Sequence, residues 1–364
     1  MKIKTGEDKY IDLHQLMAEK NASDLYLTFW EPPTLRINNQ LHRLEQLPIM
    51  TDEMLNEIKE RLVKPEMAEY FTKNLSIDLW VSNTWRRYRV NISKQQWHIM
   101  IVSRLFMEAA PTIDQLWLPA ILKDLASKSS WIILVTGPTW CGKSTTLAAM
   151  IQEINLNYSK HIITLEDPIE YKFKPEKSII EQKELWRDVI WFWSSSKFTL
   201  RQRPDVILFG EIRDLEGIKN AILLAETWHL LVASIHSRSS VQTLNKIIWS
   251  FPAEQQNQIR MQLAENLLAI ISQKLIKSQD NLSMVVAMEI MINNTAIENM
   301  IRENKMNMVN NTILTNKKYW MQLMEEELIN LVINKKITVQ DAINNANDPL
   351  YISKELVSRG VIAK

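Results

Sequence analysis

The sequence predicts an α/β protein, with an N-terminal α+β domain followed by a parallel-sheet domain that ends in a helical C-terminal region. Three observations lead to this prediction. The chain has 364 residues, which is longer than one typical domain. From residue 131 onward, short β-branched runs alternate with helical stretches, as in βαβ units. Between the first such strand and its helix lies the pattern G-x-x-x-x-G-K-[ST], which in this context marks a phosphate-binding loop.

The α+β domain is predicted for residues 1–106. Apolar spacing indicates a helix at 9–21, and helices at 51–63 and 66–73 follow a Thr51 cap and Pro65. Alternating apolar residues predict strands at 23–28, 34–37, 75–81, 87–93 and 97–105. Residues 107–115 combine a proline, small residues and charges, so they are the expected linker.

Residues 116–290 predict the α/β core. Strands are expected at 132–136, 161–165, 206–209 and 230–235, with helices at 142–158, 190–202 and 214–226. After residue 239 the pattern is mostly helical, at 253–277 and then, within the C-terminal region 291–364, at 295–314, 321–333 and 338–358. Ligands of parallel sheets bind beyond the carboxyl ends of the strands, so the residues at those ends are the candidates for chemistry.

Composition excludes several classes of protein. The net charge of +1 gives no reason to expect nucleic-acid binding. A single cysteine, Cys141, excludes an internal disulfide; we interpret it as a small loop residue, with a redox sensor as the alternative. No apolar run approaches the ~20 residues that span a bilayer, and charges interrupt the N-terminus too often for a signal peptide. A soluble protein without direct membrane insertion is therefore expected.

The loop at 137–144 predicts ATP and Mg²⁺ as cofactors. Its backbone N–H groups and the start of the next helix would cradle phosphate oxygens, while Lys143 adds charge at the β and γ phosphates. Ser144 would offer its hydroxyl to Mg²⁺. The candidate nucleotide-binding residues are Gly137, Pro138, Thr139, Gly142, Lys143, Ser144 and Thr145.

Acidic residues end two of the predicted strands. Glu166 is the candidate base that polarises the attacking water, and Glu211 is the candidate Mg²⁺ ligand. Gly210 stands where an Asp is usual, so a water-mediated contact between Glu211 and Mg²⁺ is expected. An isolated carboxylate is more often a helix cap or a solvated loop residue. Several carboxylates at neighbouring strand ends beside one phosphate loop instead favour a catalytic role.

For two further groups of residues, the sequence alone leaves the choice between a structural and a functional role open. His229 and His236 flank the strand at 230–235, where they serve either as structural residues or as sensors of the nucleotide. Arginines crowd the last strands of the first domain, either as a solvated face or as donors to another subunit's phosphate: Arg86, Arg87, Arg89 and Arg104.

Five segments in order resemble the secretion and pilus-motor ATPases, over nearly the whole chain. Their sequences are similar to an N-terminal signature (22–37), a Walker A loop (135–150), an Asp box (164–170), a Walker B strand (204–214) and a His box (225–236). Residues 296–303 resemble the motif associated with pilus retraction rather than extension.

The resemblance implies a PAS-like domain followed by a RecA-like domain, in a cytoplasmic homohexamer that acts on an inner-membrane platform protein. It implies catalytic roles for Lys143, Glu166, Glu211 and His229, and for Arg89 and Arg104, which would reach a neighbour's nucleotide. The implied function is ATP-driven retraction of a type IV pilus, as in twitching motility.

Tryptophan occupies positions where this family has glycine. The chain has 6 glycines and 13 tryptophans, whereas average usage would give about 25 glycines. Glycine is favoured where φ is positive, and tryptophan tolerates that conformation poorly. We therefore hypothesise an altered version of a natural motor, with catalysis weakened by the residue inside the phosphate loop. The positions are Trp30, Trp117, Trp131, Trp140, Trp186 and Trp228; Glu298 and Arg203 also depart from the family pattern.

Three alternatives stay open. The first is a pilus-extension or type II secretion ATPase. Such proteins typically carry a four-cysteine zinc element, and the single cysteine of this chain excludes that element. A RecA-like nucleic-acid translocase is disfavoured by the near-neutral charge. A catalytically inactive nucleotide-binding assembly protein is the third, because of Trp140.

Overall fold

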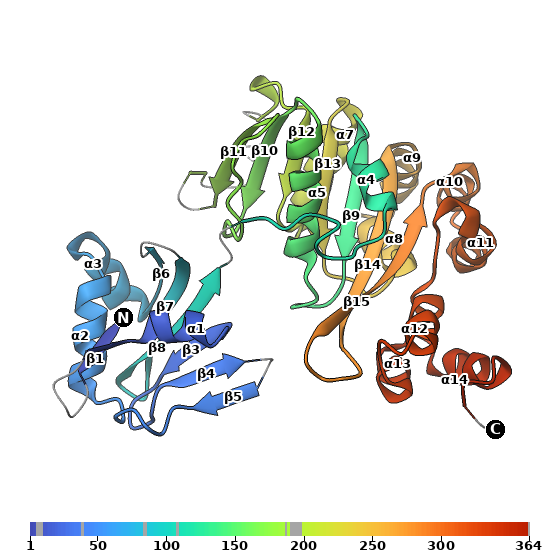
Figure 1. Cartoon of the computed structure of the whole chain (residues 1–364). Coiled ribbons are helices and arrows are strands. Elements are labelled where there is room, and N and C mark those ends of the chain that lie inside the picture. Colours follow the sequence, from blue (N-terminus) through green and yellow to red (C-terminus); the bar gives the residue numbers. More distant parts are fainter. Residues whose placement is uncertain are drawn as a thin grey trace. The chain divides into compact units, whose positions relative to one another are not determined.

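The computed structural model describes residues 1–4, 10–37, 40–82, 86–106, 109–185, 188–189 and 199–362. The chain divides into two compact units, Met1–Glu108 and Ala109–Lys364, and each has its own sheet and core (Figure 1). Trp186 and residues 190–198 of the helix predicted at 190–202 lie outside the described residues, as do residues 107 and 108 of the expected linker; residues 199–201 are helical.

The first unit is built on a six-stranded antiparallel sheet in the order β5-β4-β3-β8-β7-β6. Alternate residues of the long strands face a core that helices cover; in β7 the buried ones are Tyr88, Val90 and Ile92. A small antiparallel pair, β1 (Lys2–Lys4) and β2 (Tyr10–Asp12), adjoins the first helix. The elements are β3 (Asp24–Leu27), β4 (Thr34–Ile37), β5 (Gln40–Arg43), β6 (Ser76–Ser82), β7 (Arg87–Gln95), β8 (His98–Phe106), α1 (Leu13–Glu19), α2 (Asp52–Leu62) and α3 (Pro65–Asn74).

Most of the predicted elements of this unit form, but two differ. The helix expected at 9–21 is shortened to α1, because Asp12 has extended backbone and its side chain accepts a hydrogen bond from the N–H of His14 as a cap. Strand β5 was not predicted, since all four of its residues are exposed and show no apolar alternation. Thr51 caps α2 as expected, and it accepts the N–H of Met54.

The second unit has a seven-stranded sheet in the order β11-β10-β12-β13-β9-β14-β15, parallel except for β15. In β9, Ile132 and Leu134 face one core while Ile133 and Val135 face the other. α4 and α5 cover one face, and α7, α8 and α9 cover the opposite one (Figure 1). The elements are β9 (Trp131–Thr136), β10 (His161–Glu166), β11 (Ile179–Glu184), β12 (Val206–Phe209), β13 (Leu230–Ile235), β14 (Leu267–Lys277), β15 (Met284–Ile292), α4 (Ile121–Ala126), α5 (Lys143–Asn157), α7 (Leu215–Glu226), α8 (Ser240–Trp249) and α9 (Gln256–Asn266).

The helix predicted at 253–277 is wrong in its second half. α9 ends at Asn266, and residues 267–277 form β14, which pairs with β9 on one side and β15 on the other. Because the first half of β14 is buried on both faces, its residues are apolar without alternation, and this pattern does not separate a strand from a buried helix.

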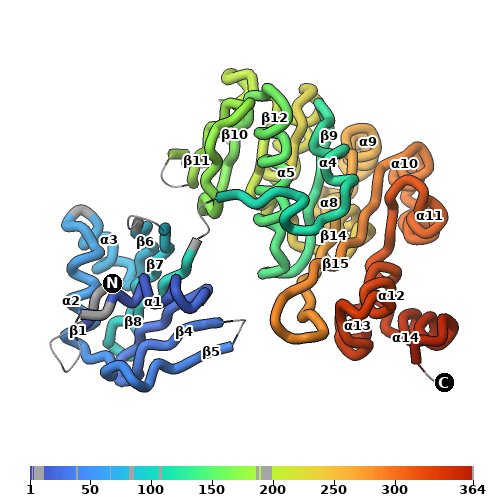
Figure 2. Tube along the Cα trace, viewed as in Figure 1, coloured from blue at the N-terminus to red at the C-terminus, as the bar shows by residue number. Residues whose placement is uncertain are grey.

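The C-terminal region is helical, as predicted, and is the orange-to-red part of the trace in Figure 2. α12, α13 and α14 pack around a small core that also receives Ile276 of β14 and Ala287 of β15. The helix expected at 295–314 is interrupted after Arg302. The elements are α10 (Thr295–Arg302), η1 (Met306–Met308), α11 (Val309–Thr315), η2 (Lys317–Tyr319), α12 (Met324–Ile333), α13 (Val339–Asn345) and α14 (Pro349–Ser358). No helix in the described part of the chain is both long enough and apolar enough to cross a membrane.

The tryptophans at positions where the resemblance implies glycine have a backbone conformation that favours glycine. The five that the structure describes have positive φ: Trp30 (64°), Trp117 (54°), Trp131 (84°), Trp140 (68°) and Trp228 (65°). Four of these side chains are exposed by 69% or more, and Trp131 by 40%. The four exposed indoles therefore gain little burial in exchange for a strained backbone.

Candidate active site

Four parallel strands bring the predicted residues to one edge of the sheet. β9 and β13 end in register at Thr136 and Ile235, and the ends of β10 and β12 lie beside them. The phosphate loop, Glu166, Glu211 and His236 follow these strand ends. The structure thus gathers at one edge candidate residues that lie up to 99 positions apart in the sequence.

The loop has the backbone of a phosphate cradle. Gly137 has φ 149° and Gly142 has φ 84°, and the loop leads directly into α5. A Cβ on Gly137 would lie 2.4 Å from the carbonyl oxygen of Gln273 and 2.5 Å from Sγ of Cys141, so only glycine fits there. Cys141 itself is buried, and burial raises the pKa of its thiol, which favours a packing role over redox sensing.

Lys143 points back over the loop. Its Nζ donates to the carbonyl oxygens of Gly137 (3.1 Å) and Pro138 (2.8 Å) and approaches Nδ1 of His236 at 3.3 Å. Burial lowers the pKa of Lys143, and no carboxylate among the described residues forms an ion pair with it. A cation held by neutral oxygens beside a helix start is an arrangement that favours an anionic ligand.

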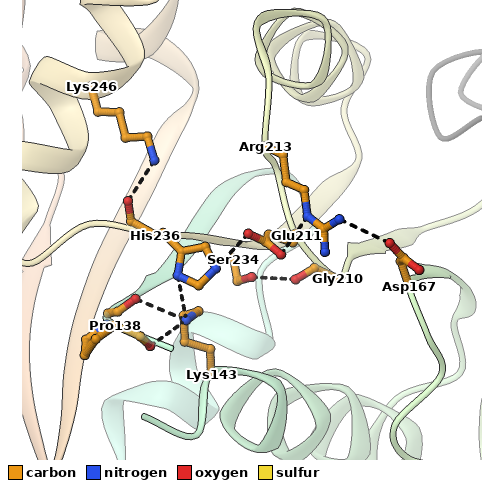
Figure 3. Close-up of polar contacts among 10 residues, drawn as sticks. Pro138, Lys143, Asp167, Gly210, Glu211, Arg213, Ser234, His236 and Lys246 are labelled. Atoms are coloured by element: carbon orange, nitrogen blue, oxygen red, sulfur yellow. Dashed lines mark hydrogen bonds and ion pairs between the residues drawn. The ribbon is translucent and has the colours of Figure 1, made fainter. Parts of the chain in front are cut away.

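A chain of polar contacts runs from the loop across three strand ends (Figure 3). Because an ammonium only donates, Nδ1 of His236 accepts from Lys143, and Nε2 carries the proton that it shares with Oε1 of Glu211 at 2.8 Å. Oε2 of Glu211 accepts from Nε of Arg213 at 2.9 Å, and Nη1 of Arg213 lies 3.3 Å from Oδ2 of Asp167. His236 therefore connects the loop lysine to the carboxylate of Glu211.

Glu166 is buried, with 8% of its surface exposed. Its Oε1 accepts from Oγ1 of Thr164 at 2.7 Å and from Nε2 of Gln182 at 3.2 Å. Burial raises the pKa of Glu166 to about 7, against the lowering effect of these two hydrogen bonds. A carboxylate with a pKa near 7 is suited to accept a proton at neutral pH.

The residues present fit Mg²⁺ held together with a nucleotide. The Ser144 hydroxyl has no hydrogen-bond partner among the residues that the structure describes, and the neighbouring Thr145 hydroxyl bonds the phenol of Tyr171 at 2.9 Å. No cluster of three His, Cys, Asp or Glu side chains in the described ranges could hold a metal on its own. Mg²⁺ commonly binds through one or two protein oxygens plus substrate phosphates, which agrees with Ser144 and Glu211 as the candidates.

A cavity of about 730 Å³ opens beside the loop. Gly137 and Pro138 line one side, and α8 lines the other with Gln242, Lys246 and Trp249. His236 and Arg238 stand between them. Space and positive charge thus meet next to Lys143.

Three predicted catalytic residues are not at this edge within the chain. His229 precedes β13, at the end of the sheet opposite the loop, and its Nδ1 lies 3.0 Å from Oγ1 of Thr227. His236 follows the other end of β13, and it is this histidine that contacts Lys143 of the loop. Arg89 makes a two-pronged ion pair with Asp78, and Nη2 of Arg104 lies 2.7 Å from Oδ1 of Asp24, both inside the first unit.

Sequence reasoning missed the groups that hold the candidates in place. Thr164 and Gln182 orient Glu166, Arg213 binds Glu211, and Tyr171 bonds Thr145. Only Thr164 and Arg213 carried a signal, because each lies two residues from its partner. Gln182 belongs to β11, an unpredicted strand, so nothing in the sequence placed it beside Glu166.

Comparisons with known proteins agree with this architecture. The family model "Type II/IV secretion system protein" matches residues 17–355. The chain is 35% identical to a twitching motility protein of Neisseria gonorrhoeae, over 87% of this chain and 84% of that protein. It is 34% identical to the type IV pilus retraction ATPase PilT of Pseudomonas aeruginosa, over 93% and 99% of the two chains.

A solved structure of the pilus retraction motor PilT with bound ADP superposes with a TM-score of 0.85 at 35% identity, covering 94% of this chain and 98% of that one. This match confirms the predicted fold class, an N-terminal domain followed by a RecA-like ATPase domain. The chain therefore belongs to the family of type II/IV secretion system proteins.

Proposed function

We propose that this protein is an ATP-hydrolysing motor that powers type IV pilus retraction. The observation that carries the proposal is the meeting of Lys143, His236, Glu211 and a buried Glu166 at one sheet edge, in a chain related over most of its length to PilT. ATP and Mg²⁺ are the proposed ligands.

Each residue has a proposed role in phosphoryl transfer. The loop N–H groups and Lys143 bind the β and γ phosphates, displacing the contacts of Lys143 with the carbonyls of Gly137 and Pro138. Glu166 accepts a proton from the attacking water. Bound Mg²⁺, held by Ser144 and through water by Glu211, would neutralise developing charge on the phosphate oxygens.

A homohexamer on an inner-membrane platform protein, on the cytoplasmic side, is the proposed working assembly. In it Arg89 and Arg104 would bind a neighbour's nucleotide, as arginines commonly do in phosphoryl transfer. Each arginine would have to exchange its present partner, Asp78 or Asp24, for phosphate. This exchange offers a way for nucleotide binding to shift the first unit of one subunit.

One observation favours a second candidate, a nucleotide-binding assembly protein with impaired catalysis. Trp140 lies inside the loop at φ 68°, a conformation costly for tryptophan. Its indole is 69% exposed and shares a smaller cavity with Thr139, Cys141 and Lys274. A strained loop would bind phosphate less well than a relaxed one.

Phosphate release, measured on samples whose mass is determined by light scattering, tests both candidates. The motor is supported if the chain releases phosphate from ATP as a hexamer and Lys143→Ala removes the activity. Activity that appears only in Trp140→Gly supports the impaired protein. Phosphate release at the same measurable rate from the chain and from Lys143→Ala would refute both, because neither candidate allows hydrolysis that is independent of Lys143.

Retraction is tested in a Pseudomonas aeruginosa strain that lacks its own retraction ATPase. Expression of the chain is expected to restore twitching, and Lys143→Ala is expected not to. Restored pilus assembly in a strain that lacks its extension ATPase, without restored twitching, would instead assign the protein to extension.

A further inference from the structure

β14 continues beyond the strand that carries the phosphate loop. It pairs with β9 as far as Ser272 opposite Thr136, the last residue of β9. From Gln273 onward β14 therefore runs beside the loop itself. None of the predicted motifs includes this strand.

Gln273 contacts the loop at two points and helix α5 at a third. Its Nε2 donates to the carbonyl oxygen of Cys141 at 2.6 Å, and its Oε1 accepts from Oγ1 of Thr146 in α5 at 2.9 Å. Its backbone carbonyl oxygen occupies the space where a side chain on Gly137 would begin. The side chain is 1% exposed, so both ends of its amide are used inside the protein.

The bond to Cys141 orients a peptide group of the loop. In a planar trans peptide the C=O and the next N–H point in opposite directions. Since the Cys141 carbonyl is fixed toward β14, the N–H of Gly142 is directed away from β14. Gly142 lies at φ 84°, which glycine adopts readily and which leaves this peptide without steric preference of its own.

We propose that Gln273 is a positioning residue for the nucleotide reaction: it holds the Cys141–Gly142 peptide so that the N–H of Gly142 is presented to phosphate. This inference rests on the proposed function, because it assumes that the loop binds ATP. Gln273 itself touches no phosphate and acts through the loop.

The test replaces Gln273 by methionine, which keeps its length and removes both hydrogen bonds. The loss of one such bond corresponds to about tenfold in affinity, so the Kd for a fluorescent ADP and the KM for ATP are expected to rise about tenfold. The kcat is expected to change less than about twofold, because the lost interaction serves ground state and transition state alike.

Asn293→Leu is the matched control. Nδ2 of Asn293 donates to the carbonyls of Ala264 and Leu267, at the start of β14, so this variant also loses two hydrogen bonds but far from the loop. Its melting temperature is expected to fall about as much as that of Gln273→Met, with an unchanged Kd.

Two more variants separate the two bonds. Gln273→Glu keeps the acceptor for Thr146 and loses the donor to Cys141, so it is expected to weaken ADP binding as Gln273→Met does. Thr146→Val loses the other bond and is expected to change the Kd by less than about threefold. If Gln273→Met fails to fold, these two variants decide the proposal.

An unchanged Kd in folded Gln273→Met or Gln273→Glu would overturn the role of Gln273 and leave the proposed function standing. An equal loss of binding in Asn293→Leu would also overturn it, by showing general destabilisation. If the unaltered chain binds no ADP, the proposed function fails, and this inference with it.

Discussion

Trp117 gives the sharpest test of the backbone strain at tryptophans with positive φ. It lies in a turn, where its N–H donates to the carbonyl of Asp114, with φ 54° and 93% of its surface exposed. A left-handed conformation costs a residue with a Cβ about 1–2 kcal/mol. The buried remainder of the indole, less than about 20 Å², is worth about 0.5 kcal/mol. Glycine at this position is therefore expected to stabilise the fold.

Comparing glycine with alanine isolates the backbone effect from the loss of the indole. At residue 117 the glycine variant should be about 1 kcal/mol more stable than the alanine variant, because alanine keeps the strained Cβ. Trp249 is the control: it ends helix α8 without positive φ, and there glycine should be about 1 kcal/mol less stable than alanine.

Equilibrium unfolding in urea measures both differences, and 1 kcal/mol corresponds to about 2–4 °C in melting temperature for a unit of this size. The predicted result is opposite signs at the two positions. If alanine is as stable as glycine or more stable at residue 117, the strain argument is wrong, for Trp140 as well.

Three further predictions follow from the structure. ATP turnover should fall with an apparent pKa near 7 as the pH is lowered, because Glu166 must be ionised to act as base. Gln182→Leu should move this acidic limb of the pH–rate profile to higher pH, since the hydrogen bond that it removes favours the ionised form of Glu166. An acidic limb that stays in place in this variant would exclude Glu166 as the base. Burial first, and then the N-terminal ammonium, lower the pKa of His14 to about 3. The pKa of His14 in the folded state lies below its unfolded value of 6.5, so the unfolded state binds more protons at any pH between the two values. Up to about 5 kcal/mol of stability should therefore be lost as the pH falls through this window. His14→Gln should remove that dependence in acid-unfolding curves, and an identical curve would contradict the assignment. Finally, mass spectrometry of peptides from the protein as its own organism makes it should show glycine at residues 117 and 140. A codon that is read as tryptophan in one genetic code and as glycine in another would place tryptophan at positions with positive φ in a glycine-poor sequence. Peptide masses that contain tryptophan at these two residues would contradict this explanation.

The parallel core and its loop could be predicted because local patterns determine them. β12 and β13 have the predicted bounds, and Lys143, Glu166 and Glu211 lie at the strand ends from which the site was predicted. The carboxyl ends of parallel strands lie at the same edge of the sheet whatever the conformation of the loops between them. Motifs that follow successive strands in the sequence can therefore be predicted to form one site.

Other parts depended on tertiary contacts that no local pattern reveals. Residues 267–271 are apolar because two neighbouring strands and helices on both faces bury them, and the spacing in the sequence alone favoured a helix over 253–277. The choice between His229 and His236 depended on which end of β13 meets the loop. Gln182, which donates a hydrogen bond to Glu166, was missed because β11 has no apolar alternation.

A structure with a non-hydrolysable ATP analogue and Mg²⁺ tests the central claim most directly. We predict phosphate oxygens against the backbone N–H groups of residues 139–145, Nζ of Lys143 turned from the Pro138 carbonyl to the β and γ phosphates, and Glu166 facing the terminal phosphorus across one water. A loop that stays closed on Lys143 or is filled by the Trp140 indole, with the nucleotide bound elsewhere or absent, would contradict the account.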